Sequence, residues 1–280
     1  MKIEGWKYYN HAAVPTCAPH EQVNLEQVKN KKIWKIEGGY PLLARWTSDY
    51  DCEKNTGWWY VVKEAPFNIE EFSSKRRKNI RQSLKKCYVT QIDPLEYCED
   101  LYYIYKAAFL KYKEADNEFT FEEFRDRCQK DKIDKVEYWG GFSAEKNFLI
   151  GYMTVESHEE YVETCVAKYH PDYLKDRVSD AIHFTVLEYY LNDKGKKYVS
   201  SGTRNINHIT NAQQYKIDNF GFRCVYCKLH VEYNPVIKPI VYLLYPFRKA
   251  IKKMDKNVMV HQIVSVLTME EIVRQSKKNE

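Results

Sequence analysis

The chain has 280 residues, of which 44% are apolar and 30% charged, a composition typical of globular proteins and not of disordered ones. Its net charge of +5 is too small at this length to indicate a nucleic-acid-binding protein by itself. Eight cysteines are too few for a disulfide scaffold, and no apolar run reaches the roughly 20 residues of a membrane helix. Because the N-terminus also lacks a signal-peptide pattern, we expect a cytoplasmic protein with free thiols and no membrane span.

Residues 1–86 are predicted to form a strand-rich N-terminal extension. Turn-like stretches separate three expected strands, at residues 32–37, 41–47 and 57–62.

The last part of this extension, residues 75–86, carries seven basic residues and no acid, and is predicted to be a helix. Ile80 and Leu84 give that helix one narrow apolar stripe. One interpretation is a helix that docks by this stripe, with its charges in water or paired with acids of the same chain, such as Glu96, Glu99 and Asp100. The other is a helix that faces phosphate or RNA.

Residues 87–234 are predicted to form a mixed α/β domain. Strands are expected at residues 87–92, 136–142, 148–157, 161–169, 197–201 and 222–233. Helices are expected at residues 95–112, 120–130, 171–191 and 210–219, and Thr120 with Glu123 forms a capping box for the second of them. This order is not simple alternation, so it favours a mixed central sheet flanked by helices over a doubly wound nucleotide-binding fold.

Residues 235–280 are predicted to form a C-terminal helical appendage. Apolar residues recur at helical spacing over residues 240–251, and a basic cluster occupies residues 248–253. A basic amphipathic helix of this kind lies on a membrane surface or, more commonly, packs on its own domain with its charges in water. A capping box at Thr268 predicts that a last helix begins near Met269.

Three stretches of the central domain resemble the GNAT superfamily of acyl-CoA N-acyltransferases. The first is the strand, proline and long helix of residues 164–191, TCVAKYHPDYLKDRVSDAIHFTVLEYYL. The second is the short strand KKYVSSGT at residues 196–203, followed by Asn207 and Asn211. The third, NFGFRCVYCKLHVEY at residues 219–233, contains the Gly-Phe pair that opens a late GNAT strand. The resemblance implies a GNAT-like sheet over residues 87–234.

The basic stretch SSKRRKNIRQSLKK, residues 73–86, resembles the FemAB-like branch of this superfamily. That branch includes aminoacyl-tRNA-dependent peptidoglycan transferases and other amide-forming enzymes. Their N-terminal extension is often a partial second copy of the fold, which implies that residues 1–86 form a partial GNAT-like half.

The resemblance implies an acyltransferase, most simply an acetyltransferase, that moves an acyl group from acyl-CoA to an amine of a small molecule or amino sugar. The usual glycine-rich pyrophosphate loop is missing, so Lys175, Arg177 and Ser179 would bind phosphate through their side chains. Gly202 lies at the cleft that holds the pantetheine arm in the superfamily, and Asn211 follows it. These five residues are the candidate cofactor site.

Amide formation needs a base for the amine and an acid for the leaving group. Glu163 is the candidate base because many GNAT enzymes hold a glutamate on the corresponding strand; Glu156 and His158 are alternatives, and an ordinary exposed strand glutamate is the competing interpretation. The acid in GNAT enzymes is often a tyrosine at the position of Ile217. Tyr215, two residues away, is therefore the candidate acid.

Two other functions remain open. A FemAB-like transferase would take an aminoacyl group from tRNA, and a binding module on a degenerate GNAT fold would have no catalysis, as the lost glycines and displaced tyrosine would suggest. No metal is expected, because Cys224, Cys227 and His230 have metal-like spacing but would point to both faces of one strand.

Overall fold

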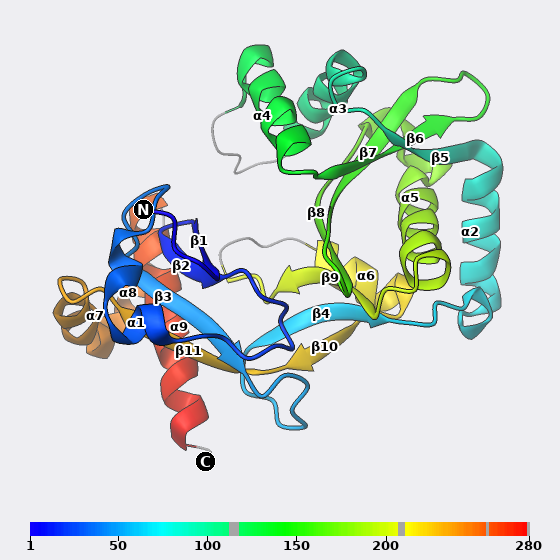
Figure 1. The fold of residues 1–280 in the computed structure, drawn as a ribbon. Coiled ribbons are helices and arrows are strands. Elements are labelled where there is room, and N and C mark those ends of the chain that lie inside the picture. The colour runs from blue at the N-terminus through cyan, green and yellow to red at the C-terminus, as the bar shows by residue number, and fades with distance from the viewer. Residues whose placement is uncertain (112–117, 207–210, 256–257, 279–280) are drawn as a thin grey trace. The chain divides into compact units, whose positions relative to one another are not determined.

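The computed structural model describes residues 1–111, 118–206, 211–255 and 258–278 (Figure 1). The chain forms two compact units. Unit 1 contains residues 1–60, 203–210 and 224–280, and unit 2 contains residues 61–202 and 211–223. The three sequence segments divided at residues 86 and 234 stay a prediction. The predicted helix end at Tyr112, the residue Asn207 and the predicted helix start at Thr210 lie outside the described residues.

Unit 1 is built on a four-stranded sheet in the order β1-β2-β3-β11, formed by Trp6–Tyr9, Ala12–Pro15, Leu43–Ser48 and Lys228–Tyr233. β1 and β2 are antiparallel, β2 and β3 are parallel, and β3 and β11 are antiparallel. Because side chains alternate along a strand, the sheet buries apolar residues on both faces.

One face of this sheet packs against α1 (Glu26–Lys29) and η1 (Lys32–Lys35), around Trp6, Ala13 and Ala44. The other face carries Leu43 and Tyr233 and packs against the C-terminal helices. These are α7 (Lys238–Leu244), η5 (Tyr245–Phe247), α8 (Arg248–Lys253) and α9 (Val258–Lys278).

Two local predictions in unit 1 are wrong, and two of its strands were not expected. The strand expected at residues 32–37 is the short helix η1, because Lys31 adopts a left-handed conformation and the Asn30 side chain accepts a hydrogen bond from the Lys32 N–H. Strands β1 and β2 were not expected. The capping box at Thr268 is absent, because α9 runs through this position and the Thr268 hydroxyl donates to the Val264 carbonyl inside the helix.

Unit 2 contains most of a seven-stranded sheet in the order β10-β4-β9-β8-β7-β6-β5. In chain order its strands are β4 (Trp59–Glu64), β5 (Cys87–Ile92), β6 (Glu137–Ser143), β7 (Leu149–Ser157), β8 (Tyr161–Tyr169), β9 (Tyr198–Thr203) and β10 (Arg223–Tyr226). Neighbours from β5 to β8 are antiparallel, whereas β8 and β9 are parallel. This arrangement confirms the predicted mixed α/β class.

Helices cover both faces of the β5–β8 part of this sheet (Figure 1). One layer contains α3 (Cys98–Phe109) and α4 (Phe121–Ile133), which bury aromatic residues of β6 and β7. The opposite layer contains α2 (Ser74–Lys86) and α5 (Val178–Leu187). Gly141 allows α5 to approach closely, since a Cβ there would lie 2.7 Å from the Val178 side chain. The remaining helical segments of the unit are η2 (Ile69–Glu71), η3 (Pro171–Asp176), η4 (Glu188–Asp193) and α6 (Ala212–Phe220).

Two longer predicted elements are divided in the structure. The helix expected over residues 171–191 consists of η3, α5 and η4, and Arg177 in a left-handed conformation separates the first two. The strand expected over residues 222–233 is split into β10 and β11, which belong to different sheets. The capping box of Thr120 and Glu123 at the start of α4 is confirmed. Within the described residues, no helix has both the length and the apolar character needed to cross a membrane.

Candidate functional site

Strands β8 and β9 stop pairing partway along their length. Their parallel register covers residues 161–163 of β8 and 198–200 of β9, although β8 continues to Tyr169 and β9 to Thr203. The pairing of β8 with β7 also shifts by one residue just after Thr164, which is a β-bulge. Bulges increase local twist, so β8 turns away from β9 beyond Glu163.

Lys216 of α6 fills the place where the two strands separate. Its ammonium donates hydrogen bonds to the Thr164 hydroxyl at 2.8 Å and to the Ser201 hydroxyl at 2.7 Å. Thr164 in turn donates to the Ser200 carbonyl at 3.1 Å. Lys216 is only 7% exposed, and a buried charge is retained only where such partners compensate its lost hydration.

Glu163, the candidate base, lies at the last paired position of β8, opposite Ser200. Its side chain is half-buried and extends beside Gly202, where a Cβ would stand 3.5 Å from the Glu163 Oε1 atom. Gly202 has φ of +78°, a conformation that side chains other than glycine's rarely adopt. We call Glu163, Thr164, Ser201, Gly202 and Lys216 the β8–β9 site.

The pKa of Lys216 differs strongly from that of an ordinary lysine. Burial lowers the pKa of Lys216 to about 8, while attraction to Cys165 and Glu163 opposes part of that change. An amine with this pKa exists in both protonation states near neutral pH, which suits proton transfer. Perturbed amines of this kind are enriched at functional sites.

The Lys216 pKa gives a test of this arrangement. The pKa is about 8 in the folded protein against 10.5 for a free lysine, so the unfolded chain binds more protons between these two values. Stability should therefore rise with pH from about 8 to about 10.5, by about 3 kcal/mol relative to Lys216→Met. Urea unfolding of both proteins across this pH range measures the difference. Parallel pH dependences of the two proteins would contradict a buried Lys216.

A second cluster in unit 2 centres on a buried ion pair between α2 and α5. The Arg76 guanidinium donates to both carboxylate oxygens of Asp180, at 2.9 and 3.0 Å. Its Nε donates to the Asn219 carbonyl at 2.9 Å, and the guanidinium lies 4.5 Å from the Phe220 ring centre. Arg177 lies 3.6 Å from the same Asp180 carboxylate. The predicted basic helix thus turns one of its arginines inward.

Tyr215, the candidate acid, belongs to this second cluster. Its hydroxyl donates to Asp180, and the Ser179 hydroxyl lies 3.3 Å away. Burial, followed by the Asp180 charge, raises the pKa of Tyr215 to about 12, so the phenol stays protonated at neutral pH. Tyr215 therefore faces α5, while the next residue, Lys216, faces β8 and β9.

His183 completes the second cluster in a neutral form. Its Nδ1–H donates to the Ser179 carbonyl at 2.7 Å, and the ring stacks on Phe220 with centres 5.1 Å apart. Burial, reinforced by Lys216, lowers the pKa of His183 to about 3. Its Nε2 is buried and accepts no hydrogen bond from the described residues.

The predicted site residues thus fall into four places. Glu163 and Gly202 lie together in the β8–β9 site, and Ser179 and Tyr215 lie together around Asp180. Lys175 and Arg177 are exposed at the turn before α5. Asn211 is exposed at the start of α6, and its side chain does not cap that helix. The assigned roles of all seven residues stay predictions.

Sequence reasoning missed Lys216 and Arg76. A lysine on a polar helix is normally expected to be in water. One weak signal for its burial was available: Lys216 precedes Phe220 by four residues, so both lie on the same helix face. Asp180, the partner of Arg76, is 104 residues away in sequence, and no local pattern links the two.

The basic helix pairs with acids of its own chain, but not with those expected. Arg76 binds Asp180, Lys86 binds Asp176 at 2.8 Å, and Arg81 binds Glu70 at 3.3 Å. The expected partners Glu96, Glu99 and Asp100 lie near or at the start of α3, on the opposite face of the sheet from α2. That detail of the prediction is therefore wrong.

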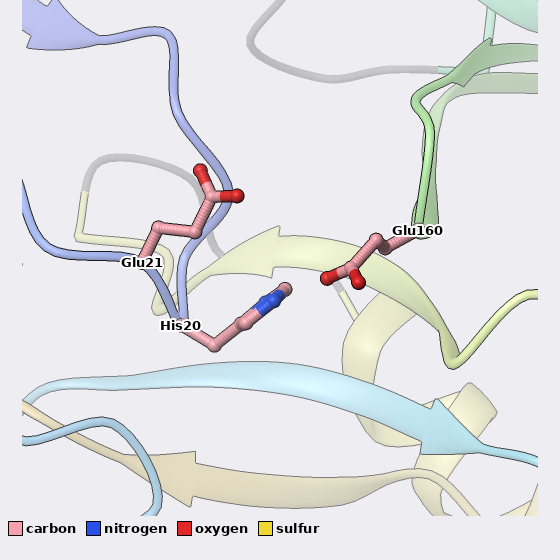
Figure 2. A group of neighbouring side chains, drawn as sticks. All are labelled: His20, Glu21 and Glu160. Carbon is pink, nitrogen blue, oxygen red and sulfur yellow. The ribbon is translucent and has the colours of Figure 1, made fainter.

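His20, Glu21 and Glu160 are drawn in Figure 2. His20 and Glu21 follow β2 and belong to unit 1, whereas Glu160 lies in the turn between β7 and β8 and belongs to unit 2. The three residues therefore do not make a metal site within either unit.

Comparisons with solved structures bear on the fold. The chain is similar to FemX, with a TM-score of 0.59 at 9% identity, over 85% of each chain. Weaker similarities connect it to L-PGS from Bacillus licheniformis, with a TM-score of 0.49 at 13% identity over 85% of this chain and 83% of that one. A GNAT-family acetyltransferase from Bacillus anthracis gives 0.33 at 15% identity over 40% and 66%. No protein-family model and no curated protein sequence matches the chain.

At this identity, the FemX similarity speaks for the fold alone, and the two lower scores add no further argument. The similarity covers most of both chains, so it extends beyond the predicted central domain of residues 87–234. The mixed sheet with its separating parallel pair β8 and β9 agrees with it. The chain therefore has a GNAT-like fold related to that of FemX, as its resemblance to the FemAB-like branch predicted.

Proposed function

We propose that this protein is a transferase that forms an amide by moving an acyl or aminoacyl group to an amine. The observation that carries the proposal is the position of Lys216. Its ammonium lies where β8 and β9 separate and donates hydrogen bonds to Thr164 and Ser201. It is also close enough to Glu163 for that carboxylate to raise the Lys216 pKa. A carboxylate and a perturbed amine at one opening in a sheet supply a base and an acid for acyl transfer.

In the proposed reaction, the nitrogen of the acceptor amine attacks the acyl carbonyl carbon, and Glu163 takes the proton that this nitrogen loses. A C–N bond forms, and the bond from the carbonyl carbon to the leaving sulfur or oxygen breaks. Lys216 uses two of its three N–H donors on Thr164 and Ser201, so the third is available to the substrate. That ammonium stabilises the developing oxyanion or protonates the leaving group.

The first candidate donor is acyl-CoA, with acetyl-CoA as the simplest case. Lys175 and Arg177 are exposed beside the N-terminus of α5 and would bind the pyrophosphate. Ser179 would contribute less than expected, since its hydroxyl already contacts Tyr215 at 3.3 Å. The acceptor in this case would be an amine of a small molecule or amino sugar.

CoA at about 100 times its dissociation constant should stabilise the wild type by about 2.7 kcal/mol. The double variant Lys175→Ala/Arg177→Ala should lose this stabilisation, because no loop glycines supply alternative phosphate contacts. Thermal unfolding with and without CoA and acetyl-CoA measures the effect. Lys194→Ala, a change at another exposed lysine of unit 2, is the control. Equal stabilisation of the double variant would show that the pyrophosphate site is placed wrongly.

The second candidate donor is an aminoacyl-tRNA, as the FemAB-like resemblance implies. The fold similarity to FemX over most of the chain agrees with that resemblance. Three exposed lysines of α2 add to it: Lys75, Lys78 and Lys85 have no acidic partner among the described residues, in contrast to the arginines of the same helix.

If tRNA binds α2, log affinity should fall linearly with log salt concentration. The triple reversal Lys75→Glu/Lys78→Glu/Lys85→Glu should reduce the magnitude of that slope by about 2 to 3, since each lost phosphate contact removes about 0.7 to 0.9. Filter binding of tRNA across a salt series provides the slope. This set omits Arg76, because its loss would destabilise the fold by leaving Asp180 unpaired. A wild type that does not bind tRNA at physiological salt would leave acyl-CoA as the donor.

A further inference from the structure

Arg45 on β3 is a half-buried cation without a hydrogen-bond acceptor among the described residues. Its guanidinium lies 5.6 Å from the ring centre of Trp58, and it forms no hydrogen bond or ion pair with any residue that the structure describes. Burial lowers the pKa of Arg45, while the Tyr60 and Tyr9 side chains oppose part of that change. A guanidinium has five N–H donors, and its removal from water is costly unless these donors find acceptors.

The other buried or half-buried arginines in the described part of the chain all have acceptors. Each donates to a carboxylate or to a backbone carbonyl: Arg76, Arg77, Arg204, Arg248 and Arg274. Arg204 and Arg248 also lie over aromatic rings, so in this protein an aromatic contact accompanies an acceptor and does not replace it. The acceptor for Arg45 therefore comes from outside the described residues, as water or as a bound anion.

Trp58 places a second donor without an acceptor beside Arg45. Trp58 is 1% exposed, and its Nε1–H is buried and makes no hydrogen bond with a described residue. An indole N–H can only donate, and buried donors of this kind normally have a partner. Two donor groups that both lack an acceptor, on and beside the same ring, favour a ligand with several acceptor oxygens over a single water.

Hydroxyl groups lie around the Arg45 guanidinium. Thr47 is two residues further along β3, so its side chain is on the same face of the sheet as that of Arg45. The Tyr60 hydroxyl lies 3.4 Å from the Thr47 hydroxyl. Tyr9 of β1 is 52% exposed, and Arg45 itself keeps some exposure, so a small ligand can reach the guanidinium from solvent. We call Tyr9, Arg45, Thr47, Trp58 and Tyr60 the Arg45 site.

We propose that unit 1 binds an oxyanion, a phosphate or carboxylate group of a small molecule, at the Arg45 site. The guanidinium donates two parallel N–H bonds to two oxygens of the anion, the geometry for which arginine is suited. Tyrosine hydroxyls donate to the remaining oxygen, and the aromatic rings pack against the rest of the ligand. All five residues belong to unit 1, so this site is separate from the β8–β9 site and from the proposed phosphate contacts of Lys175 and Arg177 in unit 2.

Titration of the full chain with sodium phosphate and, separately, with sodium acetate tests this proposal. Sodium chloride keeps the ionic strength constant, and tryptophan fluorescence follows binding because the guanidinium covers the Trp58 ring. We expect a saturable change with at least one of the two anions, and the anion that binds more tightly identifies the group. Arg45→Met should weaken that binding by at least about tenfold, the usual effect of losing a charge-assisted hydrogen bond. Arg45→Lys keeps the charge without the fork of donors and should weaken it by a few-fold.

The matched control is Arg248→Met, which removes an arginine of unit 1 that lies 4.3 Å from the Tyr245 ring centre but has its own carboxylate, Glu271, at 2.9 Å. This variant should bind the anion as the wild type does, and so should Lys175→Ala/Arg177→Ala. Arg45→Met leaves no acid unpaired, so it should keep the fold, which circular dichroism checks.

Three results would overturn the proposal. The first is a wild type that binds neither phosphate nor acetate, since water would then complete the Arg45 site. The second is an Arg45→Met variant, or in its place Arg45→Lys if the former does not fold, that binds the anion as tightly as the wild type. The third is an equal loss of binding in Arg248→Met, which would show that the anion responds to the overall charge and not to this site.

Discussion

Replacing Arg76 by alanine should lower the free energy of unfolding by about 3–5 kcal/mol, the usual cost of leaving one partner of a buried ion pair alone. The Asp180 carboxylate is 3% exposed and receives two hydrogen bonds from Arg76. Without Arg76, only Arg177 at 3.6 Å and the Tyr215 hydroxyl would remain near this charge. Urea unfolding monitored by tryptophan fluorescence measures the change.

Two further variants show whether loss of the Arg76–Asp180 ion pair causes this drop in the free energy of unfolding. Lys78→Ala removes an exposed charge from the same helix and should change stability by less than about 0.5 kcal/mol. Arg76→Met/Asp180→Leu removes both charges and should recover much of the stability, because no buried charge is then left unpaired. A loss of under about 1 kcal/mol for Arg76→Ala would contradict the buried pair.

Glu163→Gln should reduce kcat by about 10²–10⁴ if Glu163 takes the proton from the acceptor amine. The amide keeps the size of the side chain but cannot accept that proton. Binding of the acyl donor should be nearly unchanged, because the carboxylate acts on the amine. Steady-state kinetics with the identified donor, together with donor binding by calorimetry, separate the two effects.

The neighbouring strand offers a matched control for Glu163. Glu156 on β7 is paired with Glu163 across the ladder, and Glu156→Gln should leave kcat within a few-fold of the wild type. If Glu156→Gln has the larger effect, the base lies on β7 and our assignment is wrong. If neither change alters the rate or its pH profile, Glu163 is an ordinary strand residue.

Elements with a strong local signal could be predicted from the sequence. The hairpin of β7 and β8 was expected within one residue of its observed bounds, because alternating apolar residues flank a polar turn. Helix α2 was expected from Ser73 and from the basic run that follows it. The Ser73 hydroxyl caps the helix by accepting a hydrogen bond from the Arg76 N–H. Its position against α5 was not predictable, because the Arg76–Asp180 pair joins residues far apart in sequence.

Elements whose form depends on distant partners could not be predicted. One apolar run became both β10 and β11, because β11 pairs with β3, about 180 residues earlier, while β10 joins the other sheet. Lys216 was missed for a similar reason. Its burial follows from the separation of β8 and β9, and no residue near Lys216 in the sequence reports that separation.

The end of the β8–β9 ladder is closed by side chains where a regular sheet would use backbone pairs. The Thr164 hydroxyl donates a hydrogen bond to the Ser200 carbonyl, and the Gln213 amide donates one to the Ser201 carbonyl. The Ser200 hydroxyl accepts a hydrogen bond from the Gly202 N–H. Side-chain bonds of this kind can open singly, without the cooperative loss of a ladder. The Gly202 amide, which donates to the Ser200 hydroxyl, should therefore exchange with deuterium by local opening, faster than the amides of residues 198–200, and a bound substrate should slow that exchange.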